Sequence, residues 1–118
     1  MRKAGIKARY RRAIREHGEP VLFRRYGGAS GSNRPVFNAE VRATVSGYDP
    51  SVLIGSIVQG DRKIIMLADD VQKAQIGLPI STNDKIVVRG RELAIKFVDD
   101  NTHRDGVELI AYELQASG

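Results

Sequence analysis

Few residues in this sequence are of the types that carry out metal or acid–base chemistry. The chain contains no cysteine, so disulfides and thiolate metal sites are excluded. Of its two histidines, His17 is expected at the end of a helix and His103 in a polar loop. Neither has a partner at the spacing of metal ligands, and a zinc site needs three or four ligands. We therefore expect structural or solvated roles for both histidines and no metal or other cofactor.

An acidic segment near the C-terminus has some features of a cation-binding loop. Asp99, Asn101, His103 and Asp105 alternate in the way that the oxygen ligands of a calcium loop do. However, histidine is a poor calcium ligand, and Glu108 falls in the next expected strand instead of closing the loop. We interpret the segment as a solvated turn.

The glycine- and serine-rich stretch at residues 27–34 invites comparison with a phosphate-binding loop. It has no Gly-Lys-Ser/Thr, and no strand–loop–helix pattern surrounds it. No serine or threonine lies close in sequence to a histidine base, so no nucleophile is indicated. We expect a chain that is not an enzyme, with a flexible loop that contacts a neighbouring subunit or a channel. The candidate contact residues of this loop are Gly27, Gly28, Ser30, Ser32, Asn33 and Arg34.

Positive charge is concentrated at the N-terminus of the chain, whose net charge is +5. Residues 1–26 hold nine Lys and Arg against two Glu, a net +7, whereas the other residues hold ten basic and twelve acidic side chains, a net −2. Arginine binds both phosphate and carboxylate groups bidentately. The segment therefore predicts a polyanion or an acidic protein surface as its partner. The candidate contact residues are Arg2, Lys3, Ile6, Lys7, Arg9, Tyr10, Arg11, Arg12, Ile14 and Arg15.

These basic residues are expected to lie on a helix over residues 2–17, which Gly18 and Pro20 would end. Basic side chains cover most of this helix, and a single narrow apolar stripe is formed by Ile6, Tyr10, Ala13 and Ile14. A stripe this thin predicts a helix that packs on the body of the chain or on a neighbouring subunit. We favour docking on a partner protein over DNA, because a helix that contacts only phosphates has no need of an apolar stripe.

The rest of the chain predicts short strands. The clearest is residues 36–46, in which apolar and polar side chains alternate strictly. Other strands are expected at residues 21–26, 57–58, 64–67, 85–89, 92–98 and 107–115, with a hairpin around Gly90-Arg91, a helical turn after Asp49-Pro50 and a short helix from Asp69 or Asp70 to Ile76.

Strands and helices do not alternate in this pattern as they do in βαβ units. It therefore predicts a mainly β fold: a small antiparallel barrel or sandwich of six to seven strands. Residues 1–19 would be a basic helical extension and residues 20–118 the β domain. The predicted core residues are Phe37, Val41, Val45, Ile86, Val88, Leu93, Ile95, Phe97, Ile110, Tyr112 and Leu114. No apolar run approaches the roughly 18–20 residues that span a bilayer, and the charged N-terminus is unlike a signal peptide. We expect synthesis inside the cell and no membrane contact.

Turn residues and apolar stretches occur in a characteristic order along the second half of the chain. The order runs through Pro79-Ile80, Asp84 to Val88, Gly90 to Leu93, residues 95–99 and residues 111–115, with residues 59–63 before another apolar strand. Over roughly residues 36–115, this order resembles the head-closure, or stopper, proteins of tailed bacteriophages and phage-like particles. The basic N-terminal helix is a departure, because the resemblance does not require it.

The resemblance implies a structural virion protein that is made in the cytoplasm of a bacterial host and resides in the head–tail neck. It would form a homo-oligomeric ring, expected to be a hexamer, below the portal and adaptor and above the tail terminator or tail tube. There it would join head to tail and help to retain packaged DNA. Two alternatives stay open: a tail-terminator or tail-completion subunit, and a stand-alone basic β-barrel that binds nucleic acid.

Overall fold

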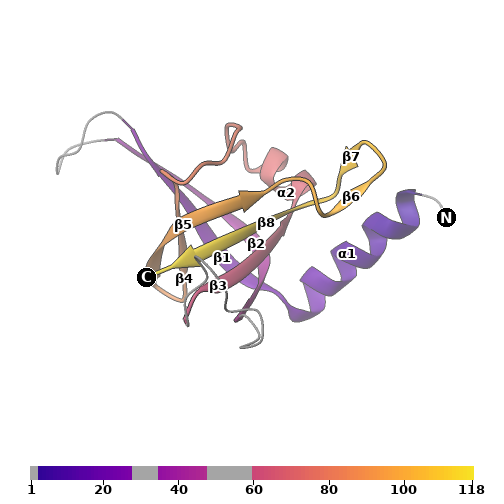
Figure 1. Cartoon of the computed structure of the whole chain (residues 1–118), viewed down its shortest axis with the longest axis horizontal. Coiled ribbons are helices and arrows are strands. Elements are labelled where there is room, and N and C mark those ends of the chain that lie inside the picture. The colour runs from indigo at the N-terminus through magenta and orange to yellow at the C-terminus, as the bar shows by residue number, and fades with distance from the viewer. Residues whose placement is uncertain (1–2, 28–34, 48–59) are drawn as a thin grey trace.

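The chain is mainly β, with a helix at its N-terminus and one short internal helix, as the sequence predicts (Figure 1). A computed structural model describes residues 3–27, 35–47 and 60–118. The predicted turn after Asp49, the strand at 57–58 and residues 28–34 of the predicted loop lie outside the described residues. In chain order the elements are α1 (Lys3–His17), β1 (Glu19–Tyr26), β2 (Val36–Gly47), β3 (Arg62–Leu67), α2 (Ala68–Lys73), β4 (Lys85–Val88), β5 (Arg91–Asp99), β6 (Arg104–Asp105), β7 (Glu108–Leu109) and β8 (Ala111–Ser117).

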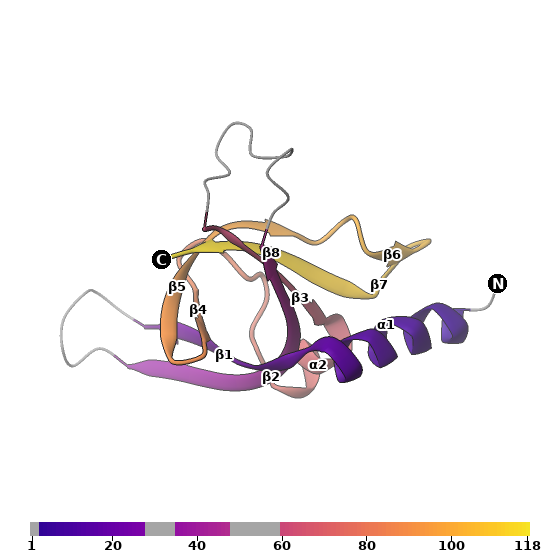
Figure 2. The ribbon, with the colours of Figure 1, turned by 90° about the horizontal axis from the view of Figure 1, so that it is seen from below.

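Six of the strands close into an antiparallel barrel, which decides between the two architectures that the sequence left open. Their order around the barrel is β1-β2-β3-β8-β5-β4 (Figure 2). Strand β1 completes the closure by pairing with β4 as well as with β2. The remaining strands, β6 and β7, form a separate two-stranded hairpin between β5 and β8 in the chain.

The barrel interior is filled by side chains that alternate along the strands. Phe23, Ile64, Met66, Ile86, Leu93 and Leu114 are among the largest side chains that are fully buried. Each such burial contributes roughly 1.5–3 kcal/mol relative to an exposed side chain. Of the predicted core, the following residues are confirmed as buried: Val41, Ile86, Val88, Leu93, Ile95, Ile110, Tyr112 and Leu114.

Two aromatic residues of the predicted core are not in it. The register between β5 and β8 shifts between Ile95 and Phe97, and this irregularity breaks the alternation, so that Phe97 is 59% exposed. Phe37 lies near the start of β2, where it packs edge-on against Phe23 but stays 38% exposed. Val45 is only partly buried, although it packs against the core.

Two predicted turns differ in detail from the structure. Helix α2 is preceded by Leu67, which makes no side-chain cap, so neither Asp69 nor Asp70 is its N-cap residue. The helix ends at Lys73 instead of Ile76, because the chain turns into the left-handed region soon afterwards, at Gln75. The hairpin between β4 and β5 turns at Arg89-Gly90, one residue earlier than predicted, and both residues have positive φ as in a type I′ turn.

The last predicted strand, residues 107–115, is in fact two strands. Glu108 and Leu109 pair with β6, and the barrel strand β8 begins only at Ala111. At this break, the amides of Ile110 and Ala111 both donate to the carbonyl oxygen of His103, so the regular strand pairing is interrupted. The β6–β7 hairpin therefore occupies part of the segment that was expected to be a polar turn.

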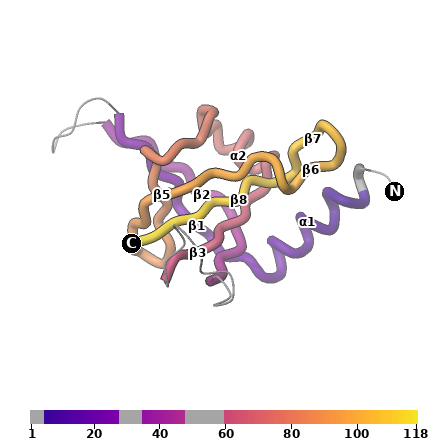
Figure 3. Tube along the Cα trace, in the orientation of Figure 1, coloured from indigo at the N-terminus to yellow at the C-terminus, as the bar shows by residue number. Residues whose placement is uncertain are grey.

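Helix α1 packs outside the barrel, on β2 and β3 (Figure 3). It runs beside the β6–β7 hairpin at one end of the molecule, whereas the start of β2 lies at the other end. Between α1 and β1, Gly18 is in close contact with backbone: a Cβ there would collide with the carbonyl oxygen of Ile14 and lie 2.8 Å from that of Ala43. The helix is therefore joined to the barrel closely, without a linker.

Candidate functional site

The apolar stripe of α1 faces its own barrel except at Ala13, which is exposed. Ile14 is buried, with 3% of its surface exposed, and the ring of Tyr10 packs edge-on against His103 at 5.6 Å. Ile6, nearer the N-terminus, is partly buried. The sequence left open whether the stripe packs on the same chain or on a neighbour, and the structure places its C-terminal part on the same chain.

A chain of three polar side chains connects the helix to the barrel wall. The Tyr10 hydroxyl lies 2.9 Å from Nδ1 of His103, and Nε2 of His103 lies 2.8 Å from Oε1 of Glu113. An ionised carboxylate only accepts hydrogen bonds, so Nε2 carries a proton, and Nδ1 of a neutral His103 accepts from Tyr10. This order of groups is also found where a base activates a nucleophile. Here it holds α1 in place, because Tyr10 is part of the helix face that packs on the barrel.

Two basic residues of α1 are neutralised by acidic residues of the same chain. Lys7 Nζ lies 2.9 Å from Oε2 of Glu108 and 3.3 Å from Oδ2 of Asp69. Arg11 also pairs with Asp69, at 3.3 Å. The hydrogen bonds to Glu108 and Asp69 raise the pKa of the Lys7 ammonium group above its ordinary value of 10.5. Lys7 and Arg11, which the sequence predicted to contact an external partner, are therefore paired within the chain.

The C-terminal end of α1 is capped by a side chain from β2. The guanidinium group of Arg42 donates to the carbonyl oxygens of Ile14, Arg15 and Gly18 at 3.3, 3.1 and 2.9 Å. The last carbonyl groups of a helix have no partner within it and carry partial negative charge, so a cation placed there satisfies and stabilises them. Side-chain contacts thus fix the helix to the barrel at its end as well as along its length.

Three further arginines of α1 lie outside the face that packs on the barrel, although Arg15 is at its edge and lines a shallow pocket with Arg42 and Asp70. Arg9, Arg12 and Arg15 are exposed, and none of them forms an ion pair with any residue that the structure describes. We call these three residues the outer arginine row. The predicted contact residues of the helix therefore divide into an inner set, which binds the chain itself, and this outer set. The side chains of Arg2 and Lys3 lie outside the described residues.

The acidic segment examined for calcium binding uses its first carboxylate in a turn. Asp99 accepts hydrogen bonds from the backbone amides of Asn101 and Thr102 and from the Thr102 hydroxyl. These bonds lower the pKa of Asp99 below its ordinary value of 3.8. Across residues 3–27, 35–47 and 60–118, no three acidic or histidine side chains are grouped so that they could hold a metal ion.

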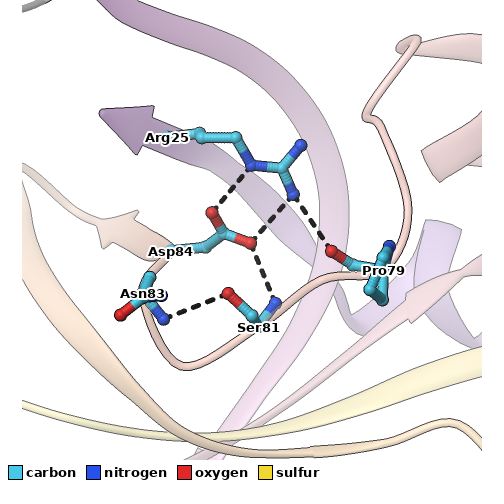
Figure 4. Close-up of polar contacts among 5 residues, drawn as sticks. All are labelled: Arg25, Pro79, Ser81, Asn83 and Asp84. Carbon is cyan, nitrogen blue, oxygen red and sulfur yellow. Dashed lines mark hydrogen bonds and ion pairs between the residues drawn. The ribbon is translucent and has the colours of Figure 1, made fainter. Parts of the chain in front are cut away.

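A second polar cluster joins β1 to the loop that precedes β4 (Figure 4). Arg25 donates from its Nε and a terminal nitrogen to the two carboxylate oxygens of Asp84, at 2.8 and 2.9 Å, and more weakly to the carbonyl oxygen of Pro79. Asp84, only 2% exposed, also accepts from the amide of Ser81. The Arg25 guanidinium carbon lies 5.1 Å from the centre of the Phe23 ring. This cluster fixes the loop that precedes β4 to the end of β1.

Exposed apolar side chains lie around this cluster. Val36 and Phe37 pair across the sheet with Tyr26 and Arg25, and both are exposed. Leu78, 62% exposed, belongs to the loop that Arg25 contacts through Pro79. Because successive side chains of a strand point to opposite faces of the sheet, Phe37 shares the face of Arg25 and Val36 does not. We call Phe37 and Leu78 the barrel-end patch.

A shallow pocket of about 450 Å³ lies near the ends of β3, β5 and β8. Its lining includes Arg62, Arg91 and Lys96, but Lys96 is bound to the buried carboxylate of Asp61 at 3.0 Å. Gln115 donates to the same carboxylate oxygen. The Asp61 carboxylate is therefore bound by side chains of β5 and β8, which indicates that it stabilises the packing of these strands.

Sequence reasoning did not identify the residues that hold α1. Asp69, Glu108, Glu113 and Arg42 were not recognised as its partners, because they come from four different elements that only the fold brings together. One feature of the sequence pointed to them: the net charge of −2 outside residues 1–26 indicates that acidic side chains elsewhere in the chain could pair with the basic helix.

Comparison with known proteins does not assign the chain to a family. No protein-family model matches the sequence, and no curated protein matches it significantly. In the described part of the chain, no helix is both long and apolar enough to span a bilayer.

Proposed function

We propose that this chain is a structural subunit of the head–tail neck of a tailed phage or phage-like particle. Copies of it would form a ring that acts in head closure, below the portal and adaptor and above the tail, and helps to retain packaged DNA. The observation that best supports this is the closed barrel in which the residues of the resemblance have defined structural roles. Asp84 anchors the turn before β4, Gly90 turns the β4–β5 hairpin at φ 81°, and Tyr112 and Leu114 of β8 fill the core.

The barrel-end patch supports assembly with further copies. A ring of identical subunits is held together by heterologous contacts, in which one surface of each subunit fits a different surface of the next. Apolar side chains gathered in one exposed place are typical of such interfaces, whereas single exposed ones are ordinary. We propose that the patch of Phe37 and Leu78 is one side of the subunit contact.

A tail-terminator or tail-completion subunit is a closely related alternative. Such a ring would use the same barrel and the same patch one level lower in the particle. A stand-alone nucleic-acid-binding barrel is favoured by one observation, the outer arginine row, but it leaves the barrel-end patch without a role.

The gene should be deleted from the genome that encodes it, and the particles examined by electron microscopy. Head closure predicts unjoined heads and tails, with heads that have lost DNA, and rescue by a tagged copy that purifies with intact particles. A terminator predicts tails of abnormal length or finish beside heads that keep their DNA. Normal tailed particles in the deletion strain would overturn the proposal.

A further inference from the structure

The outer arginine row has a regular geometry. Arg9, Arg12 and Arg15 follow one another at every third residue of α1, so they lie along one face over about 9 Å of helix axis. Glu16 is the only acidic residue of the helix, and it forms no ion pair with a described residue. Lys7 and Arg11 of the same helix are paired with Asp69 and Glu108. The fold has therefore sorted the basic residues into a neutralised inner set and an exposed cationic outer row.

The outer face lacks what a protein partner would normally require. Protein interfaces are centred on buried aromatic or aliphatic anchors, surrounded by polar contacts. Here the anchors of the helix, Tyr10 and Ile14, are directed at the barrel. Among the apolar side chains of the helix that the structure describes, the outer side offers only Ala8 and Ala13. A surface of arginines without anchors matches the phosphate backbone of a nucleic acid, which is bound by charge and by bidentate hydrogen bonds.

The scale and rigidity of the row also suit a duplex. Duplex DNA carries one negative charge per roughly 1.7 Å of axis, so a row about 9 Å long spans about five charges. Arg42, His103 and the acidic partners of Lys7 already hold the helix in place. Less ordering is then required when the arginines bind, which favours affinity.

We propose that the outer arginine row of α1 binds the phosphate backbone of double-stranded DNA without sequence preference. This replaces the expectation that the helix docks on a partner protein, because the two largest side chains of the C-terminal part of the stripe, Tyr10 and Ile14, pack on the chain itself. The inference rests on the proposed function in one respect: a neck ring encounters packaged duplex DNA, which is then the natural ligand.

The test is a fluorescence-anisotropy titration of a labelled duplex of mixed sequence with the purified full chain. Three phosphate contacts predict a slope of about −2.7 in log affinity against log salt, which is about a 40-fold loss between 50 and 200 mM. Arg9→Gln with Arg12→Gln should reduce the slope to about −0.9 and weaken binding at 50 mM salt at least tenfold. The matched control is Lys85→Gln with Arg91→Gln, which removes the same net charge from the barrel wall formed by β4 and β5. Its affinity for the duplex should be within twofold of that of the wild type.

Three results would overturn the inference: no duplex binding at 50 mM salt, equal losses in the two double variants, or displacement of the duplex by polyglutamate at equal charge. The last result would identify the row as a site for acidic protein. Circular-dichroism melting should show all variants folded, because none of the four residues is buried. Binding with the purified chain is independent of particle assembly. If the wild-type chain does not bind the duplex but its deletion gives the head-closure phenotype, the inference alone is rejected. If the chain binds the duplex but is absent from particles, the proposed function is rejected.

Discussion

Single buried charges in this protein are held by several partners each, and Asp84 is the clearest case. Its carboxylate accepts from two nitrogens of Arg25 and from the Ser81 amide, while only 2% of its surface is exposed. Such a group stabilises the barrel end only as long as its donors are present, because a buried carboxylate that loses a donor still carries its desolvation cost.

Asp84→Ala should therefore destabilise the barrel strongly. Removing one partner of a buried ion pair costs about 3–5 kcal/mol, and the partial exposure of Arg25 places the expected loss near 3 kcal/mol. Urea unfolding of the purified chain measures it. Asn83→Ala, in the same loop but exposed, is the control and should change stability by less than about 0.5 kcal/mol. Equal effects of the two substitutions would show that the Arg25–Asp84 pair does not hold the barrel end.

Glu92 predicts a pH dependence of stability. Hydrogen bonds from Tyr26 and Arg24 lower the pKa of Glu92 below its ordinary value of 4.5. A carboxyl whose pKa is lower in the folded state contributes stability that is present above 4.5 and is lost as the pH falls through the folded-state pKa. Glu92→Gln should therefore lose less stability than wild type as the pH is lowered below 4.5. Parallel stability curves for the two proteins, measured by urea unfolding from pH 7 to pH 3, would contradict this.

At the scale of elements, the main structural feature is that α1 belongs to the barrel. Its residues Tyr10 and Lys7 and its C-terminal carbonyl groups all have partners on β2, α2, β7 or the loop before β6. Gly18 makes this arrangement possible, since the backbone of α1 and that of β2 approach each other at the position where a Cβ would lie.

Gly18→Ala should weaken the docking of α1. The added methyl group would meet the carbonyl oxygens of Ile14 and Ala43, both of which are backbone and cannot move independently, so we expect a loss of about 1–3 kcal/mol. Thermal melting compared with Gly47→Ala is the measurement, because a Cβ at Gly47 would meet no atom within 4 Å. If both variants melt like wild type, the close approach at Gly18 does not exist in solution.

Sequence patterns predicted these elements where local chemistry determines them. The strict alternation of residues 36–46 predicted β2, and Gly18 correctly marked the end of α1. The exposure of Phe97 could not be predicted, because the irregularity that turns it outward arises from pairing with a strand nearly twenty residues later. The partners of Lys7 could not be predicted either, because Asp69 and Glu108 are distant in sequence and only the folded barrel brings them to Lys7.

For the whole molecule, the described surface offers two faces with different chemistry. The outer arginine row lies on α1, outside β2 and β3, and the barrel-end patch lies at the start of β2 and in the loop before β4. In Figures 1 and 2, α1 and the start of β2 are at opposite ends of the molecule. This separation would allow a subunit in a ring to contact its neighbour with one face and DNA with the other.

Phe37→Ser with Leu78→Ser should prevent assembly while leaving the subunit folded, because both side chains are already substantially exposed. In a strain that carries only this variant, the protein should be absent from purified particles. Val107→Ser is the matched control, since Val107 is 89% exposed but lies at the tip of the β6–β7 hairpin, away from the patch. Normal incorporation of the double variant would remove the patch from the subunit contact.

Cryo-electron microscopy of DNA-filled particles from the strain that encodes the chain tests the central claim most directly. The account predicts a closed ring of six-stranded barrels at the neck, between portal and tail, with the barrel-end patch between subunits. Particles whose neck contains no density for this barrel, or in which the chain is absent by mass spectrometry, would contradict it.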